Sequence, residues 1–248
     1  MENGSTSLHP SPILNPDGSQ NRIPPKTRRT DEFRESKGIV PGDVARRVFG
    51  SDPCGLADCE ENRDSIAKTQ RQAIVTAGLL PALSWPSGFD AKGTEHGVRF
   101  RGLWVEKHQH SDGWSPLLDS RGMLGIRPAL PLEYLRRLDL QNDLFGDEIR
   151  VLGLTRAGRF TTTQPTLRGD EPGENEIRDV LEEAGWRRVP ISMQNLPSQL
   201  MGSAWWHTEE ALVLLDARKP NFKKTAFGVL PIDLVLADLT PVMRQRFS

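Results

Sequence analysis

The spacing of polar residues between positions 212 and 233, LVLLDARKPNFKKTAFGVLPID, restricts the fold more than any other feature of the sequence. An apolar run ends on Asp216, Asn221 follows five positions later, and Asp233 comes twelve positions after Asn221. A basic hairpin is predicted between Asn221 and Asp233, and apolar runs flank the two acidic residues. We therefore expect short strands to deliver two carboxylates and an amide to the ends of a hairpin.

Each of these polar residues also has a purely structural interpretation. Asp216 stands where an apolar strand gives way to a loop, and Pro220 keeps the following backbone from continuing as a helix. Asp, Asn and Pro are also the commonest turn formers, so Asp216 and Asn221 could simply form a turn. Asp233 has apolar neighbours, where a carboxylate is costly unless it is paired or bound to a metal; the alternative is a solvent-facing Asp on an alternating strand.

The three residues together match the chemistry of phosphoryl transfer. This reaction needs an acidic group at the attacking hydroxyl, and a carboxylate and an amide oxygen that hold Mg²⁺ against a polyphosphate. Arg218 and Lys219 add positive charge beside Asp216, where Arg218 is the candidate for a further catalytic group near the γ-phosphate. In the structural interpretation both cations are solvated. The segment therefore predicts a two-metal phosphate site.

Composition divides the 248 residues into an arm and one folded domain. Residues 1–40 are rich in Ser, Pro, Asn and Gly and are predicted to be disordered, residues 41–90 form a leading helical segment, and residues 91–248 form the main domain. The net charge of −1 argues against a nucleic-acid partner. With no apolar run long enough to span a membrane and no apolar leader, we expect a soluble, cytoplasmic protein.

Hydrophobic periodicity predicts a mixed series of helices and strands. The expected helices are 64–77, one that begins at Pro131, and 174–184, and the expected strands are 98–100, 103–107, 148–154, 160–164 and two around Asp216 and Asp233. A Gly/Ser/Asp-rich loop is expected before Pro131. The order is typical of an α+β domain.

Several segments resemble the kinase-like domain found in polyvalent proteins of phages and conjugative elements. DARKPNF and LPID carry the resemblance, together with the upstream TTTQP and PLEYLRRLDLQNDLFGDEI, and it covers about residues 93–236. It implies a protein-kinase-like two-lobe fold with a reduced C-terminal lobe and ATP as the phosphoryl donor. It also implies that Asp216 is the catalytic base and that Asn221 and Asp233 bind Mg²⁺. Thr163 and Gln164 would form the hinge against the adenine.

The resemblance also assigns a lysine and a glutamate to the nucleotide. Lys107 falls on the inward face of its predicted strand and would hold the α- and β-phosphates, and Glu133 would pair with it from the following helix. Lys107 could instead be a solvated strand-end lysine, and Glu133 could pair with Arg137 one turn later. Residues 93–97, GTEHG, stand where a glycine-rich phosphate loop is expected but lack the G-x-G-x-x-G pattern.

Other features depart from a protein kinase. Leu214 and Leu215 replace the His and Arg that precede the catalytic Asp, and apolar residues replace the Phe-Gly after Asp233. Only fifteen residues follow Asp233, so we expect no activation segment and no large helical lobe. The acceptor is therefore left open between a protein and a small molecule.

Two further groups of residues contain side chains that can bind metals. His108 and His110 share a strand face and could bind a metal with Asp112, although a polar strand edge explains them better because no fourth ligand follows. Cys54 and Cys59 are interpreted as free thiols, because two cysteines make neither a disulfide framework nor a zinc set.

The sequence thus leaves three hypotheses. The first is a kinase-like phosphotransferase that depends on ATP and Mg²⁺ and uses the residues named above. The second is a pseudokinase or nucleotide-binding interaction module that transfers nothing, which the missing glycine loop favours. The third is a metal-dependent hydrolase built on Asp216, Asp233 and the histidines.

Overall fold

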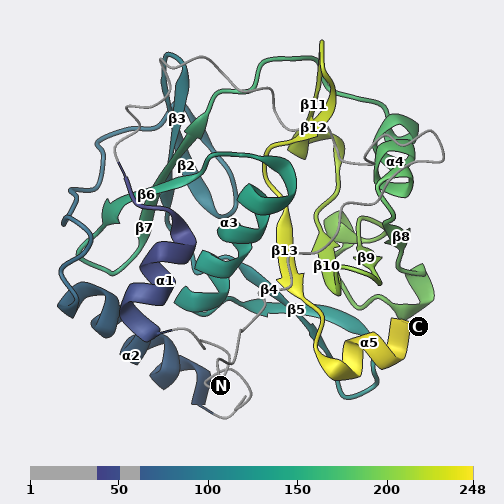
Figure 1. The fold of residues 1–248 in the computed structure, drawn as a ribbon, viewed down its shortest axis with the longest axis horizontal. Helices are drawn as coiled ribbons and strands as arrows, with labels where there is room; N and C mark the ends of the chain where they lie inside the picture. Colours follow the sequence, from purple (N-terminus) through teal and green to yellow (C-terminus); the bar gives the residue numbers. More distant parts are fainter. Residues whose placement is uncertain (1–37, 51–61, 248) are drawn as a thin grey trace, which may run out of the picture.

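The computed structural model describes residues 38–50 and 62–247, which form a mixed α+β fold with several antiparallel sheets and five helices. In Figure 1 a five-stranded sheet and helices α1 to α3 occupy the left and centre, and a four-stranded sheet with α4 and α5 occupies the right. Helix α3 (Pro131–Phe145) contacts strand β13 (Val235–Asp238) between the two sheets. This contact brings the C-terminal segment against the middle of the chain.

The five-stranded sheet has the order β1-β2-β3-β7-β6 and is antiparallel throughout. Its strands are β1 (Ala91–Lys92), β2 (His96–Arg101), β3 (Trp104–Gln109), β6 (Arg150–Leu154) and β7 (Phe160–Pro165). In the register of β3 with β7, Val105 pairs with Gln164 and Lys107 pairs with Thr162. Since paired residues and every second residue share a face, Lys107 and Gln164 lie on the same side of this sheet.

The leading helices α1 (Pro41–Phe49) and α2 (Arg63–Thr76) pack with α3 against this sheet. Val44 and Ile74 from these helices are buried in one cluster with Tyr134 and Phe160. At the start of α1 the backbone N–H of Gly42 donates to the Asp139 carboxylate, which satisfies one of the free amides of the helix end. The helices 41–49 and 63–76 therefore belong to the same core as the first sheet.

The second sheet has the order β13-β10-β9-β8 and is also antiparallel. Its remaining strands are β8 (Arg187–Arg188), β9 (Trp205–His207) and β10 (Leu212–Leu215). Every residue of β10 is buried, because β10 lies between β9 and β13 with one hydrophobic cluster on each face. Helix α4 (Glu174–Glu183) covers one face with Ile177 and Leu181, and α5 (Pro241–Phe247) covers the other with Met243 and Phe247.

Two hairpins complete the described residues. One joins β11 (Phe222–Thr225) to β12 (Gly228–Pro231), as the sequence predicts. The other joins β4 (Trp114–Leu118) to β5 (Leu124–Pro128) in a stretch for which the Gly/Ser/Asp content predicted a loop. That prediction was wrong because cross-strand pairing and burial of Leu124 in a core cluster outweigh weak local strand propensity.

Most predicted elements are present with shifted ends. The helices predicted at 64–77 and 174–184 occupy Arg63–Thr76 and Glu174–Glu183, and a helix begins at Pro131 as expected. Leu103 was expected on a strand face but lies in the β2–β3 turn, where its side chain is exposed. Most of the predicted arm, together with Cys54 and Cys59, lies outside the described residues, although Ile39 exchanges two backbone hydrogen bonds with Val151 of β6.

Candidate functional site

Asp216 lies at the first position after the buried strand β10, where the chain turns into the loop that carries Asn221. Its backbone has φ = 64°, a left-handed conformation that Asp tolerates better than most side chains. The Arg218 Nε donates to the Asp216 carboxylate, and the Asn221 side-chain amide donates to the Asp216 carbonyl at 2.8 Å. The strand end and the loop are thereby tied into one unit.

The β11–β12 hairpin returns the chain to this unit. The backbone N–H of Ile232 donates to the Asn221 carbonyl at 2.8 Å, so Asp233 follows directly after a residue bonded to Asn221. Asp233 lies in the short connection between β12 and β13 rather than inside a strand. The hydrogen bonds thus join the segments that carry the three polar residues that the sequence singled out.

Lys107 reaches the same place from the first sheet. Its Nζ lies 3.5 Å from an Asp233 carboxylate oxygen and donates to the Ile232 carbonyl at 3.1 Å. The Gln164 side-chain amide donates to that same carbonyl at 3.2 Å. Thr163 is the next residue along β7, so its side chain leaves the sheet on the opposite face. Of the two predicted hinge residues, only Gln164 points toward the Asp233 segment.

The predicted partner of Lys107 is elsewhere. The Glu133 carboxylate accepts from Arg63 at 2.6 Å and from Arg127 at 3.2 Å, and it also caps the backbone N–H of Leu130 at the start of α3. The expected pair between Lys107 and Glu133 is therefore wrong, and so is the alternative pair with Arg137. Glu133 is the third residue of its helix, where its carboxylate satisfies a free backbone amide and compensates two arginines.

Arg137 is the residue of α3 that enters the site, one turn after Glu133. It is buried, and its guanidinium donates to the Leu234 carbonyl at 2.7 Å and to an Asp233 oxygen at 3.0 Å. It also donates to both oxygens of the buried Glu95, at 2.7 and 2.8 Å. Sequence reasoning missed this role, although Arg137 follows the buried Tyr134 by three positions and so shares its helix face.

Glu95 ends the turn between β1 and β2, where a phosphate loop was expected, and His96 is the first residue of β2. Both side chains are buried, and the His96 ring lies 2.8 Å from the Tyr134 hydroxyl and 3.9 Å from an Asp233 oxygen. Gly113 makes room for the Glu95 carboxylate: its φ is 74°, and a Cβ there would overlap a Glu95 oxygen. Lys107, Asp233, Arg137, Glu95 and His96 therefore form one group, which we call the Asp233 cluster.

Burial and charge set the protonation states in the Asp233 cluster. Burial alone would raise the pKa of Asp233, but Lys107 and Arg137 outweigh it and hold that pKa well below its usual range. For Arg137, burial alone would lower the pKa of the guanidinium, but the Glu95 carboxylate outweighs burial and raises that pKa. Burial lowers the pKa of His96 to about 4 and raises the pKa of the Tyr134 hydroxyl. At neutral pH the cluster holds two cations, two carboxylates and a neutral histidine.

The neutral His96 predicts a pH-dependent stability. Its folded-state pKa lies below the ordinary value of 6.5, so the folded protein binds fewer protons and loses stability as the pH falls from 6.5 through 4. We expect this group to contribute on the order of 3 kcal/mol to that loss. Urea unfolding at pH 7 and pH 4.5, without metal, should show a smaller loss in His96→Gln than in the wild type.

His110→Gln is the matched control for that measurement, because the His110 ring is more exposed than the His96 ring and bonds the Gly93 carbonyl. Its loss of stability between the two pH values should equal that of the wild type. An equal loss in His96→Gln would show that His96 is not the group responsible.

The donor types at Asn221 and Asp233 fit Mg²⁺ held against a polyphosphate, which takes one or two carboxylates and further oxygens from phosphate. The Asn221 amide nitrogen donates to the Asp216 carbonyl, and this hydrogen bond orients the amide. The Asp233 carboxylate is partly exposed. No group of three His, Cys, Asp or Glu side chains suited to a metal occurs among residues 38–50 and 62–247. Any metal would therefore rely on oxygens from a ligand as well as on these two residues.

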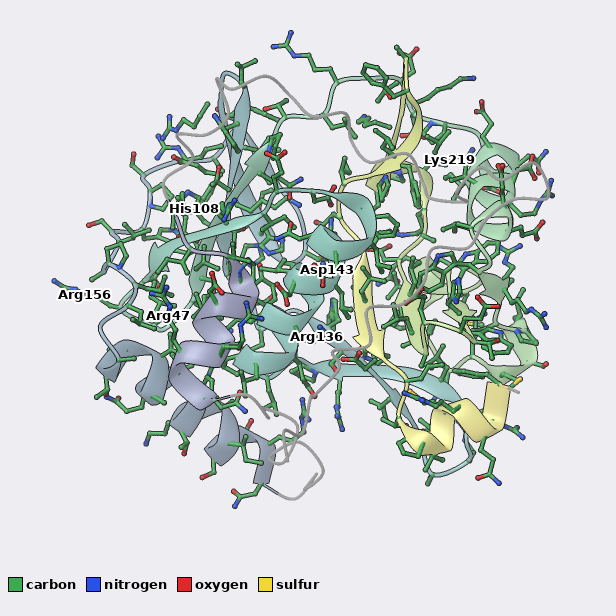
Figure 2. The ribbon with its side chains drawn as sticks, viewed as in Figure 1. Arg47, His108, Arg136, Asp143, Arg156 and Lys219 are labelled. Atoms are coloured by element: carbon green, nitrogen blue, oxygen red, sulfur yellow. The ribbon has the colours of Figure 1, made fainter. Side chains whose placement is uncertain are left out.

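The histidine pair does not join the Asp233 cluster. His108 bonds the Thr161 hydroxyl at 3.1 Å, His110 bonds the Gly93 carbonyl at 3.0 Å, and Asp112 is held by Arg71 and Arg159. In Figure 2 His108 lies on the five-stranded sheet, far across the molecule from Lys219. The structure therefore gives the proposed hydrolase site of Asp216, Asp233 and these histidines no common centre.

Among the described helices, none has the length and apolar character needed to cross a membrane. No family model, curated protein or solved structure matches this chain. The geometry of the Asp233 cluster and of the loop after Asp216 is therefore the basis for a functional conclusion.

Proposed function

We propose that this chain is a kinase-like phosphotransferase that uses ATP and Mg²⁺. The observation that carries the proposal is the approach of Lys107 to Asp233, in which a cation from the first sheet meets a carboxylate 126 positions later at 3.5 Å. The Asn221 carbonyl accepts from the backbone N–H of Ile232, beside Asp233, and the Asn221 side-chain amide donates to the Asp216 carbonyl. A lysine, two carboxylates and an amide at one site match the groups that phosphoryl transfer requires.

Each residue has a distinct role in this proposal. Asp216 orients the acceptor hydroxyl and takes its proton, while Arg218, which already contacts Asp216, lies where negative charge develops on the transferred group. Lys107 exchanges its long contact with Asp233 for the phosphates of the nucleotide. Gln164, which lies near the end of β7 and reaches the Ile232 carbonyl, would contact the adenine.

Asn221 and Asp233 are the residues that would hold the metal. Bound Mg²⁺ would neutralise the charge of the polyphosphate and fix its orientation. Asp233 suits this role because Lys107 and Arg137 keep it ionised, and an ionised carboxylate is the form that binds a cation. Arg137 can remain with Glu95 when Asp233 turns to a metal, so the buried pair is not broken.

A thermal-shift titration tests the proposal. Mg-ATP at 100 times its dissociation constant should stabilise the wild type by about 2.7 kcal/mol, and Asp233→Asn should remove most of this stabilisation because the ionised metal ligand is lost. Asp238→Asn is the matched control, since Asp238 lies in the next strand on the surface and pairs with Arg136. Its shift should equal that of the wild type.

The metal dependence adds a second measurement. In the wild type, ATP with EDTA should raise the melting temperature much less than Mg-ATP does. In Asp233→Asn, ATP with EDTA and Mg-ATP should raise the melting temperature by nearly the same amount. The proposal fails if Mg-ATP at millimolar concentration leaves the melting temperature of the wild type unchanged.

A nucleotide-binding module without transfer activity is the second candidate. The observation that favours it is that cations already engage both acidic residues: Arg218 contacts Asp216, and Arg137 contacts Asp233. Such contacts stabilise the fold whether or not a phosphoryl group is transferred. Mg-ATP binding with no turnover of ATP, and no labelled acceptor in a lysate, would select this candidate.

A further inference from the structure

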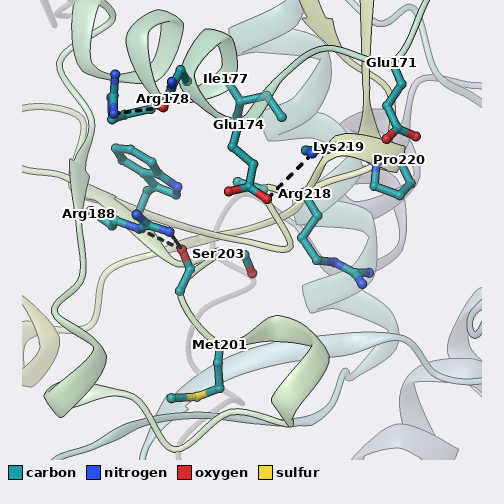
Figure 3. A pocket seen from close by; sticks show the side chains of 14 residues that line it. Glu171, Glu174, Ile177, Arg178, Arg188, Met201, Ser203, Arg218, Lys219 and Pro220 are labelled. Atoms are coloured by element: carbon teal, nitrogen blue, oxygen red, sulfur yellow. Dashed lines mark hydrogen bonds and ion pairs between the residues drawn. The ribbon is translucent and has the colours of Figure 1, made fainter.

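A cavity of about 440 Å³ opens directly beside the loop that follows Asp216. Figure 3 shows it between the first turn of α4, the segment around Met201 and Ser203, and the loop at Arg218 to Pro220. The loop is joined to the opposite wall by a hydrogen bond from the backbone N–H of Ala217 to the Ser203 carbonyl. The volume of the cavity is in the range of small-molecule sites in proteins.

The floor of the cavity is apolar and its rim is charged. Trp205 and Ile177 are buried at the floor, with Ala217 beside them. The charged lining residues are four cations and two acids, so the cavity has a positive balance: Arg178, Arg188, Arg218, Lys219, Glu171 and Glu174. A positive rim over an aromatic floor selects small anions that carry an apolar or flat portion.

Three of the four cations have a carboxylate partner. Arg178 pairs with Asp179 at 2.8 Å, Lys219 pairs with Glu174 at 3.9 Å, and Arg218 contacts Asp216. These contacts lower the charge that these three residues can offer to a ligand. Arg188 is the fourth cation of the rim.

Arg188 differs from the other three. Its Nε and Nη2 both donate to the Gly202 carbonyl, at 2.8 and 2.6 Å, and its guanidinium lies 5.9 Å from the centre of the Trp205 ring. Within the part of the chain that the structure describes, no acidic side chain pairs with Arg188, and Nη1 makes no hydrogen bond. Arg188 is therefore held in a fixed orientation at the cavity with an uncompensated charge, which is how proteins present arginine to an oxyanion.

We propose that this cavity binds the oxyanion group of the phosphoryl acceptor, and that the acceptor is a small hydroxylated molecule with a phosphate or a carboxylate. This inference rests on the proposed function, because it places the acceptor next to Asp216. Arg188 holds the oxyanion, Trp205 contacts the rest of the molecule, and Arg218 links the cavity to Asp216. An anchor at Arg188 would present a neighbouring hydroxyl of the acceptor to Asp216.

Calorimetric titration at low salt with glycerol 3-phosphate, glycerate and glycerol tests the proposal. The phosphate and the carboxylate probe distinguish the two oxyanions, and glycerol is the neutral control that should not bind. Arg188→Gln should weaken binding of the preferred anion by about 10- to 100-fold, because it removes a charge-assisted hydrogen bond. Arg187→Gln is the matched control: Arg187 is the other residue of β8, lies over Trp206 and does not line the cavity.

A second variant keeps the test valid if Arg188→Gln unfolds. Glu174→Gln removes an exposed negative charge from the rim and should tighten anion binding by about two- to fivefold at low salt. Binding of neither anion to the wild type overturns the proposal, as does equal binding by the wild type, Arg188→Gln and Glu174→Gln. Displacement of the anion by a non-hydrolysable ATP analogue with Mg²⁺ also overturns it, because the anion would then occupy the nucleotide site.

The outcomes for the cavity and for the proposed function are separable. Arg188-dependent anion binding in a protein that does not bind Mg-ATP supports the oxyanion site and rejects the phosphotransferase. Mg-ATP binding and turnover without anion binding rejects this cavity as the acceptor site and leaves the phosphotransferase standing.

Discussion

In the proposed phosphotransferase, Asp216→Asn is expected to slow Mg²⁺-dependent turnover of ATP by about 10²- to 10⁴-fold, because the amide cannot accept the proton of the attacking hydroxyl. Asn is the informative replacement, since it tolerates the left-handed backbone at φ = 64°, where Ala would add strain. The affinity for Mg-ATP should stay close to that of the wild type, because Asn221, Asp233 and Lys107 are unchanged. Measuring the rate of ATP turnover and the dissociation constant separately checks both statements.

Glu210→Gln is the control for that comparison. Glu210 is exposed near the opposite end of β10, so its replacement removes a carboxylate far from the Asn221 loop. Its turnover should match that of the wild type. If Asp216→Asn retains turnover within about twofold of the wild type while Asp233→Asn abolishes it, Asp216 is not the base.

The second large effect concerns the stability of the Asp233 cluster. Arg137→Met should lower the free energy of unfolding by about 3 to 5 kcal/mol, because it leaves the buried Glu95 carboxylate without its cation. The Arg137 and Glu95 side chains are 3% and 9% exposed, so water cannot replace the lost partner. Urea unfolding at pH 7 measures the difference.

The neighbouring residue provides the control. Arg136 makes a bidentate pair with Asp238 at 2.9 Å, but both side chains are about half exposed. Arg136→Met should therefore cost about 1 kcal/mol or less. In Figure 2 Arg136 lies on α3 beside β13.

A double variant separates the charge from the packing. Glu95→Gln combined with Arg137→Met removes both members of the buried pair and should recover part of the lost stability. If the double variant is as unstable as the sum of the single ones, the destabilisation comes from lost packing of the arginine rather than from the unpaired carboxylate.

The sequence was informative where local pattern decides structure. The apolar run that ends at Asp216, the basic hairpin and the helix that begins at Pro131 could all be predicted, because helix and strand periods depend on residues a few positions apart. The hairpin β4–β5 (Trp114–Leu118 and Leu124–Pro128) could not, since its residues resemble a loop and its strands are stabilised by burial. The same limit applies to the candidate site.

Site residues show this division one by one. Asp216, Asn221 and Asp233 could be proposed from the sequence because their spacing along one short segment is itself the signal. Glu133 was assigned to Lys107 on position in the helix, but a carboxylate at the third helical residue caps its own helix start and accepts from two arginines. Choosing Arg137 in its place required knowing which turn of the helix faces the Asp233 segment.

By itself the sequence determined most of the helices and strands, with the β4–β5 hairpin as an exception, and the spacing of the acidic residues on either side of the last hairpin, because these depend on neighbouring positions. Only the tertiary structure decided which cations meet those acids. Lys107 and Arg137 reach the Asp233 segment from 125 and 97 positions away, through the side of a sheet and the turn of a helix that pack against it. Such partners are set by how whole elements pack, and packing minimises buried unpaired charge over the entire molecule rather than along the chain.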